Sequence, residues 1–475
     1  MLRLHRENRV FYFIFYILWI CVLMFKMPEF NSFRDQANYI TLFVANIIIF
    51  GHLFLVLNNR GIDFLEPWPF FFLLNAALFV VYPVILIWEN NTLCAGKYDV
   101  MDGCIWGTIV FIIAYFAFSH SYFMVVPEPG QLEDADELSE EVEDSDNFDM
   151  RKFRVIALAG WIFCFGCAAL SVIVGGRSFL SIISFGTAGL GVNTDLMTDT
   201  PLKFLINFEF SMLGFALYII LFFRSNILKL VVLYLTLSVY IAGGFRFIVL
   251  GMLIALGAVY YIRRKSRPPL RIIVIALIVA VLFSTYLGMV RRDLRSGAGM
   301  QIAEVQVDDV EYMFYSNLNI YQTYYGVAAK VPMDLPHTFG RATIFDTAIM
   351  FIPRSIWSGK PTAGQSASLS TIKNAIHPDV LGRYGMATPY LTEIYLDYTV
   401  LGVWIIMLKL AKIIGGVYSS TQYKNVSRSS IIRYCLFLGL FMQLIIRGYF
   451  ASGFWMVVFA YIPYFLFEKT NIAKP

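Results

Sequence analysis

The chain has 475 residues, of which 58% are hydrophobic, 17% aromatic and only 15% charged. Soluble domains carry about 25% charged residues, so this composition excludes an ordinary soluble enzyme and indicates a protein with many membrane spans. The formal net charge of +4, from 37 basic and 33 acidic residues, is too balanced to suggest a nucleic-acid partner.

Twelve apolar runs approach the roughly 20 residues that a helix needs to cross the hydrocarbon core of a bilayer. The last two runs, and the seventh with the eighth, fit either a tight hairpin or one broken helix, so the count is eleven or twelve. The sequence predicts an all-α, polytopic transmembrane helical bundle. In chain order the runs are 10–27, 38–57, 69–88, 105–126, 155–175, 204–223, 227–242, 244–262, 271–289, 394–414, 432–447 and 449–467.

The first run continues from Val10 to about Met27 without a small-residue cleavage site, so no cleavable signal peptide is expected. Cys164 and Cys167 have redox-motif spacing, but inside an apolar run we expect them to be packing residues. Cys94 and Cys104 share one short loop. They would pair only if that loop faces an oxidising compartment, and the sequence leaves this open.

Lys and Arg in short loops mark the cytoplasmic side. Twelve spans place all four basic clusters of this chain on that side, together with both termini. The clusters are Arg3, Arg6 and Arg9; Arg151, Lys152 and Arg154; Arg263, Arg264, Lys265, Arg267 and Arg271; and Lys424, Arg428 and Arg433.

This topology divides the chain into five segments. They are N-terminal transmembrane helices (1–127), an acidic cytoplasmic linker (128–150), central transmembrane helices (151–289), a large, partly helical extracytoplasmic loop (290–393) and C-terminal transmembrane helices (394–475).

The acidic linker contains Asp134-Ala-Asp136 and Asp144-Ser-Asp146. Both match the Asp-x-Asp pattern that holds a metal and a nucleotide diphosphate in many sugar transferases. A low-complexity acidic run produces such matches by chance, so we interpret it as a solvated linker. The sequence has no Gly-rich phosphate loop and no metalloprotease or hydrolase motif, so we expect no nucleotide-driven chemistry on the cytoplasmic side.

The large loop carries two features of interest. A tyrosine-rich helical stretch provides either stacking platforms for sugars or, as we favour, an interfacial aromatic belt; its members are Tyr312, Tyr315, Tyr321, Tyr324 and Tyr325. The apolar segment Ala348 to Ile352 predicts a short helix against the membrane, followed by a turn. That turn would hold Arg354 and Lys360 at headgroup depth, where they would bind a lipid phosphate or snorkel to ordinary anionic lipid.

Two arginines lie at the outer ends of predicted spans, Arg246 in the eighth and Arg447 in the eleventh. An arginine in a helix core costs about 2.5–3.5 kcal/mol by insertion scales, so such residues face a cavity or a partner. With Arg354 and Lys360 they supply four cations on one face, and guanidinium groups bind phosphate oxygens bidentately. An interfacial anchor or a structural salt bridge is the alternative, and it is favoured for Arg177.

The candidate proton acceptor is Glu393, where the loop re-enters the membrane, with Asp397 one helical turn further on the same face. A partly buried carboxylate there would act as a general base or as the ion-pair partner of an arginine. His337 and His377 are the other candidate bases.

The order of these motifs resembles the Wzy-type polysaccharide polymerases, which include O-antigen and enterobacterial-common-antigen polymerases. The resemblance covers roughly residues 230 to 460 and does not include the acidic linker. It rests on Gly243-Gly-Phe-Arg246 at the start of a span, Ile352-Pro-Arg-Ser-Ile-Trp-Ser-Gly-Lys-Pro361 in the long loop, Glu393 to Gly402 at the re-entry, and Arg447 near the end of a late span.

The resemblance implies a metal-independent, GT-C-like glycosyltransferase of the bacterial inner membrane without a cofactor. Donor and acceptor would both be polyprenyl-diphosphate-linked oligosaccharides in the bilayer, and a chain-length regulator is a further candidate partner. Arg246, Lys360 and Arg447 would bind diphosphate with support from Arg354, and Glu393, Asp397 and His377 would be the catalytic candidates.

Two other functions stay open at this point. An O-antigen ligase-type transferase would use the same donor with a different acceptor. A flippase or transporter of lipid-linked sugars would show two similar halves, but the sequence shows no internal repeat and its long loop lies between the ninth and tenth runs rather than centrally.

Overall fold

The computed structural model describes residues 9–30, 32–90, 93–94, 98–126, 149–174, 205, 207–242, 246–264, 266, 268–296, 318, 320–350, 352, 356–360, 388–421, 428–446 and 450–468. A few positions inside these helices are described by their backbone alone, and Arg246 is one of them.

The described residues are almost entirely helical. A two-residue antiparallel pair, β1 (Leu93–Cys94) with β2 (Tyr98–Asp99), joins the fourth helix to the fifth. The longer helices are α1 (Arg9–Phe25), α2 (Phe33–Asn59), α3 (Pro67–Ala76), α4 (Tyr82–Trp88), α5 (Cys104–Val125), α6 (Met150–Val174), α10 (Glu209–Phe222), α11 (Asn226–Ala242), α12 (Arg246–Arg263), α13 (Leu270–Ser296), α15 (Tyr321–Lys330), α18 (Tyr390–Ser419), α19 (Arg428–Ile446) and α20 (Phe450–Glu468).

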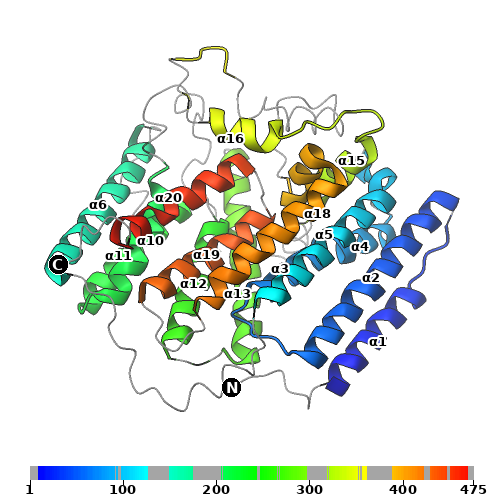
Figure 1. The fold of residues 1–475 in the computed structure, drawn as a ribbon, viewed down its shortest axis with the longest axis horizontal. Helices are drawn as coiled ribbons and strands as arrows, with labels where there is room; N and C mark the ends of the chain where they lie inside the picture. Colours follow the sequence, from blue (N-terminus) through cyan, green and yellow to red (C-terminus); the bar gives the residue numbers. More distant parts are fainter. Residues whose placement is uncertain are drawn as a thin grey trace.

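Short elements complete the architecture. The π-helix η2 (Ala77–Val81) makes α3, η2 and α4 one continuous span, the 3₁₀-helix η3 (Val100–Gly103) precedes α5, and the π-helix η5 (Arg341–Phe345) runs into α16 (Asp346–Ile349). Figure 1 shows α1 and α2 along one edge of the bundle, α6 and α11 along the other, and α18, α19 and α20 between them.

The predicted all-α membrane bundle is confirmed. Among the described residues, seven helices are long and apolar enough to cross a membrane, and five shorter apolar helices lie at the remaining predicted runs. Both ambiguous pairs are two separate helices. In the α19–α20 pair, the Tyr461 hydroxyl donates to the Arg433 carbonyl at one end, while Gly453 faces Leu444 near the other, so the pair is an antiparallel hairpin.

The bundle has two ends that the contacts distinguish. The loop end, as we call it, carries η5, α16 and the first turns of α18 and α20. At the opposite end α10 finishes, and the Arg428 guanidinium at the start of α19 lies 5.3 Å from the ring centroid of Phe222. Leu221, beside Phe222, lines one cavity with Arg263 at the end of α12. Helices α12 and α19 are therefore antiparallel, and Arg246 and Ile446 lie toward the loop end.

Two glycines let α12 and α19 approach closely. A Cβ added to Gly251 would overlap the backbone carbonyl of Gly439, and a Cβ on Gly439 would stand 2.5 Å from the carbonyl oxygen of Gly251. Small residues at such crossings are typical of helix pairs in membranes, where close van der Waals packing replaces the hydrophobic effect.

The tyrosines of α15 are core residues, so neither the aromatic belt nor the sugar platform is correct for them. Tyr321, Tyr324 and Tyr325 are each 0% exposed. The Tyr324 hydroxyl donates to the Gly107 carbonyl at 2.7 Å, and the Tyr325 hydroxyl donates to the Phe79 carbonyl at 2.8 Å. Because these two hydroxyls meet acceptors inside the bundle, burial of the Tyr324 and Tyr325 rings is favourable. Tyr312 and Tyr315 lie outside the described residues.

Three of the cysteines that the sequence singled out are buried where the helices pack against one another. Cys164 and Cys167 are free and buried in α6, as expected. Cys104 is also a free thiol, fully buried at the start of α5. A disulfide between Cys94 and Cys104 is therefore not formed, because the side chain of Cys104 is enclosed in the helix packing.

Helix α18 is kinked at Thr399, whose φ of 60° and ψ of −174° lie outside the helical region. A β-branched residue at positive φ is a genuine backbone outlier, and this region of φ and ψ is essentially restricted to glycine. The kink separates a short first segment, which carries Glu393 and Asp397, from the long span that follows. It directs that first segment against the loop.

We expect Thr399→Gly to raise the stability of the protein by about 1 kcal/mol, because glycine adopts this conformation without steric cost. Thr399→Ala is the matched control, since it keeps a Cβ and hence the strain. The measurement is the thermal unfolding midpoint of the purified protein in detergent. A midpoint for Thr399→Gly at or below that of Thr399→Ala would contradict the strain.

Candidate functional site

The loop end is organised by one carboxylate, that of Asp397, which is 0% exposed. Its Oδ1 accepts a hydrogen bond from the Ala342 backbone N–H at 3.1 Å and another from the Thr338 hydroxyl. Its Oδ2 accepts from the backbone N–H and the hydroxyl of Thr343, each at 2.7 Å. Both oxygens are thus fully engaged by the loop.

These bonds explain where the loop helix begins. A helix leaves its first backbone N–H groups without intrahelical partners, and a carboxylate near a helix N-terminus stabilises it. Asp397 supplies that carboxylate from another element, so the helical segment starts at Arg341, through η5 and α16. The predicted helix over Ala348 to Ile352 is therefore wrong in its start and end, because the capping residue is distant in sequence.

His337 and Thr338, in the same loop, hydrogen-bond to backbone carbonyls of α18. The His337 Nδ1 lies 3.1 Å from the carbonyl oxygens of both Tyr395 and Leu396, and the Thr338 backbone N–H donates to the Leu396 carbonyl at 3.0 Å. As carbonyls only accept, Nδ1 carries the proton. The His337 ring also packs edge-on against Tyr395, with centroids 5.5 Å apart. This histidine holds the loop in place.

Glu393 joins α18 to the start of α20. Its side chain is 2% exposed, and Oε2 accepts the backbone N–H of Phe450, the first residue of α20, at 2.7 Å. The Thr388 side chain also hydrogen-bonds this carboxylate. The position of Arg447 is three residues before Phe450 in the chain. The carboxylate is thus held at the first residue of α20, close in sequence to this predicted phosphate ligand.

A third acidic residue, Asp346, completes a carboxylate cluster that consists of Asp346, Glu393 and Asp397. Asp346 is 7% exposed at the start of α16 and, like Asp397, is close enough to Glu393 to interact with it electrostatically. The indole Nε1 of Trp455 in α20 donates to the Thr347 carbonyl at 3.0 Å, which ties α16 to α20. Within the described part of the chain, no group of three His, Cys, Asp or Glu side chains has metal-binding geometry.

Lys360 lies in the loop beyond α16. Its ammonium donates to the carbonyls of Met350 at 2.9 Å and Ile352 at 2.8 Å, and so closes the turn after α16. An ammonium has three donors, so these two bonds orient it toward the carbonyl end of α16. The Lys360 side chain therefore stabilises the loop through these two hydrogen bonds.

The packing of α12 against α19 brings the backbone of Arg246 and Ile446, the residue before Arg447 in the chain, toward the same level. Arg246 is five residues before Gly251, and Ile446 is seven residues after Gly439. At 1.5 Å per residue, the two helix ends extend roughly 8 Å and roughly 10 Å beyond the glycine contact, on the same side. Arg447 itself, Arg354, His377 and Arg177 lie outside the described residues, and only the backbone of Arg246 is described.

Sequence patterns did not single out Asp346 or Glu209. Glu209 begins α10, is 5% exposed, and its backbone carbonyl accepts the Tyr240 hydroxyl at 2.8 Å. An ionisable residue inside an apolar run is a functional candidate by default, and that signal was present for Glu209. For Asp346 the signal was absent, because its relation to Glu393 depends on a contact between the loop and α18.

Comparison with known proteins assigns the chain to a family. The chain has no significant match among curated proteins or among solved structures. The sequence model of one family, described as O-antigen polysaccharide polymerase Wzy, matches residues 8–473, nearly the whole chain. This match extends the resemblance into the first half of the chain and supports neither the ligase nor the transporter. The chain belongs to the O-antigen polysaccharide polymerase Wzy family and is a multi-pass membrane enzyme that joins O-antigen repeat units.

Proposed function

We propose that the loop end is the site of glycosyl transfer between two polyprenyl-diphosphate-linked oligosaccharides. A hydroxyl of the acceptor repeat attacks the anomeric carbon of the donor glycan. The new glycosidic C–O bond forms as the bond from that carbon to the diphosphate breaks. The polyprenyl diphosphate departs with the electron pair, and the hydroxyl proton passes to a carboxylate of the enzyme.

Glu393 is the proposed base, and its position is the observation that carries the proposal. Its carboxylate lies at the N-terminus of α20, three residues from Arg447 in the chain, and Oε2 has one backbone donor. A general base must reach the reacting hydroxyl while retaining acceptor capacity. Asp397 has both oxygens engaged by Thr338, Ala342 and Thr343, which favours a positioning role for it. His377 is retained as a second candidate base.

The departing diphosphate needs positive charge. We assign this role to Arg246 and Arg447, with Lys360 and Arg354 from the loop, because donors aimed at a developing charge lower the barrier to its formation. The convergence of the α12 and α19 ends supports the first pair. Lys360, whose ammonium donates to the carbonyls of Met350 and Ile352, would add positive charge from the loop.

In this proposal the cations replace a metal ion, so catalysis is metal-independent. The basic clusters favour cytoplasmic termini and a loop end on the extracytoplasmic face of the bacterial inner membrane. A regulator of chain length is a further proposed partner.

We expect Arg246→Ala and Arg447→Ala to abolish long polysaccharide chains while the protein stays inserted and abundant, because each removes a bidentate phosphate ligand. Lysine at either position should restore only part of the chain length. The measurement is the ladder of surface polysaccharide in a strain that lacks the chromosomal copy. Arg151→Ala, on an exposed residue of α6, is the matched control. Ladders of normal length in both variants would refute the assignment.

We expect Glu393→Gln to lower the catalytic rate and Asp397→Asn to lower the stability of the protein. The glutamine keeps an oxygen for the Phe450 N–H but cannot take a proton, so the rate of the purified enzyme should fall about 10²- to 10⁴-fold with little change in thermal stability. The asparagine turns an amide NH₂ toward donors of the loop, so stability should fall by about 1–3 kcal/mol. An active Glu393→Gln enzyme would exclude Glu393 as the base.

Removal of divalent metals should leave the rate of repeat-unit joining unchanged, because the diphosphate charge is offset by side-chain cations. The assay uses purified protein and lipid-linked repeats, with and without chelator. Loss of activity on chelation, followed by recovery on addition of a divalent cation, would show that the proposed cations are insufficient.

A further inference from the structure

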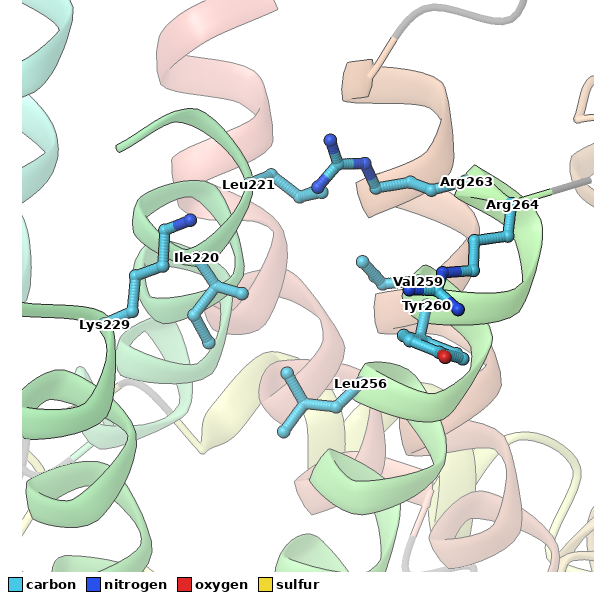
Figure 2. A pocket seen from close by; sticks show the side chains of 8 residues that line it. All are labelled: Ile220, Leu221, Lys229, Leu256, Val259, Tyr260, Arg263 and Arg264. Atoms are coloured by element: carbon cyan, nitrogen blue, oxygen red, sulfur yellow. The ribbon is translucent and has the colours of Figure 1, made fainter. Parts of the chain in front are cut away.

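A cavity of about 540 Å³ lies at the opposite end of the bundle. It is lined by residues from the last turn of α10, the first turn of α11 and the end of α12, and Figure 2 shows their side chains. Helix α12 separates it from Arg246 by roughly 25 Å at 1.5 Å per residue. Its volume is in the range of small-ligand sites, and no step of glycosyl transfer uses it.

The cavity combines apolar walls with a cationic rim. Ile220 and Leu221 from α10 and Leu256 and Val259 from α12 supply the walls. The rim has three cations from two helices, Lys229, Arg263 and Arg264, and none of the described residues that line the cavity is acidic. Like charges that share a low-dielectric cleft repel one another, so this lining favours the binding of an anion.

Arg264 is oriented for such a ligand. Its guanidinium carbon lies 4.4 Å from the centroid of the Tyr260 ring, and Figure 2 shows the group beside that ring. Stacking on an aromatic face uses the plane of the guanidinium and leaves its edge N–H groups available for phosphate oxygens. Arg263 extends from the same helix end toward Leu221, across the mouth of the cavity.

The surface next to the cavity is apolar and exposed. Leu253 and Tyr260, two turns apart on α12, are 47% and 48% exposed, and Leu230 on α11 is 65% exposed. In a membrane-spanning bundle such a surface faces acyl chains. A ligand with a phosphate at the rim and a hydrocarbon tail would therefore fill the cavity and continue along α11 and α12, whereas free phosphate would leave the walls unfilled.

We propose that this cavity binds an anionic glycerophospholipid, with its phosphate held by Lys229, Arg263 and Arg264 and an acyl chain against Leu256 and Val259. Basic pockets between transmembrane helices are suited to such headgroups. The basic run 263–271 belongs to a loop that the positive-inside bias places in the cytoplasm, so the lipid comes from the cytoplasmic leaflet. Three cations match a head with two phosphates better than one with a single charge.

Binding is tested with the purified full-length protein by native mass spectrometry, titrated with cardiolipin, phosphatidylglycerol, phosphatidylcholine or inorganic phosphate. We expect retention of cardiolipin, then phosphatidylglycerol, with little phosphatidylcholine. Cardiolipin should also raise the thermal unfolding midpoint, whereas inorganic phosphate should not. Equal stabilisation by inorganic phosphate, or equal retention of phosphatidylcholine, would overturn the proposal.

The variant with Lys229→Gln, Arg263→Gln and Arg264→Gln should bind cardiolipin at least tenfold more weakly. The matched control removes the same charge from exposed positions of α6 and α18, through Arg151→Gln, Lys409→Gln and Lys412→Gln, and should bind as the natural protein does. If the triple variant does not fold, Tyr260→Leu keeps the charge but removes the ring beneath Arg264, and should weaken binding. Unchanged binding in the cavity variants, or an equal loss in the control, would refute the site.

Discussion

The loop end depends on the contact between the Asp397 carboxylate and the loop segment that starts at Thr338. A buried carboxylate is costly unless its oxygens are hydrogen-bonded, and this one is satisfied by two backbone N–H groups and two hydroxyls. Without it, η5 would lose its cap and α16 would lose its position against α20. The carboxylate cluster of Asp346, Glu393 and Asp397 exists because this contact brings a loop residue to a membrane helix.

The kink at Thr399 and the glycine contact of α12 with α19 serve the same arrangement. The kink directs the first segment of α18 toward the loop, where Glu393 meets the start of α20. The close approach at Gly251 and Gly439 brings the ends of α12 and α19 to a common level. Backbone strain costs stability, and here it lies at Thr399, two residues after Asp397.

The two ends of the bundle differ in chemistry. The loop end gathers buried carboxylates, and the cations assigned to it come from helix ends and the loop. The opposite end gathers Lys229, Arg263 and Arg264 around apolar walls. A diphosphate bound at the loop end and an anionic lipid bound at the opposite end would both contact α12, which runs from one site to the other. That helix also carries Gly251, which meets Gly439 of α19.

The sequence by itself determined the membrane class, the eleven or twelve apolar runs, the basic clusters and the resemblance to the family whose model matches the chain, because hydropathy and charge act locally along the chain. Tertiary structure alone decided that Tyr324 and Tyr325 are core residues, that Cys104 stays a free thiol, that Asp397 caps η5 and that Asp346 joins Glu393. Each of these depends on a partner distant in sequence, such as Gly107 for Tyr324 or Thr343 for Asp397. Periodicity predicts which face of a helix is apolar, but only packing selects the residue that meets that face.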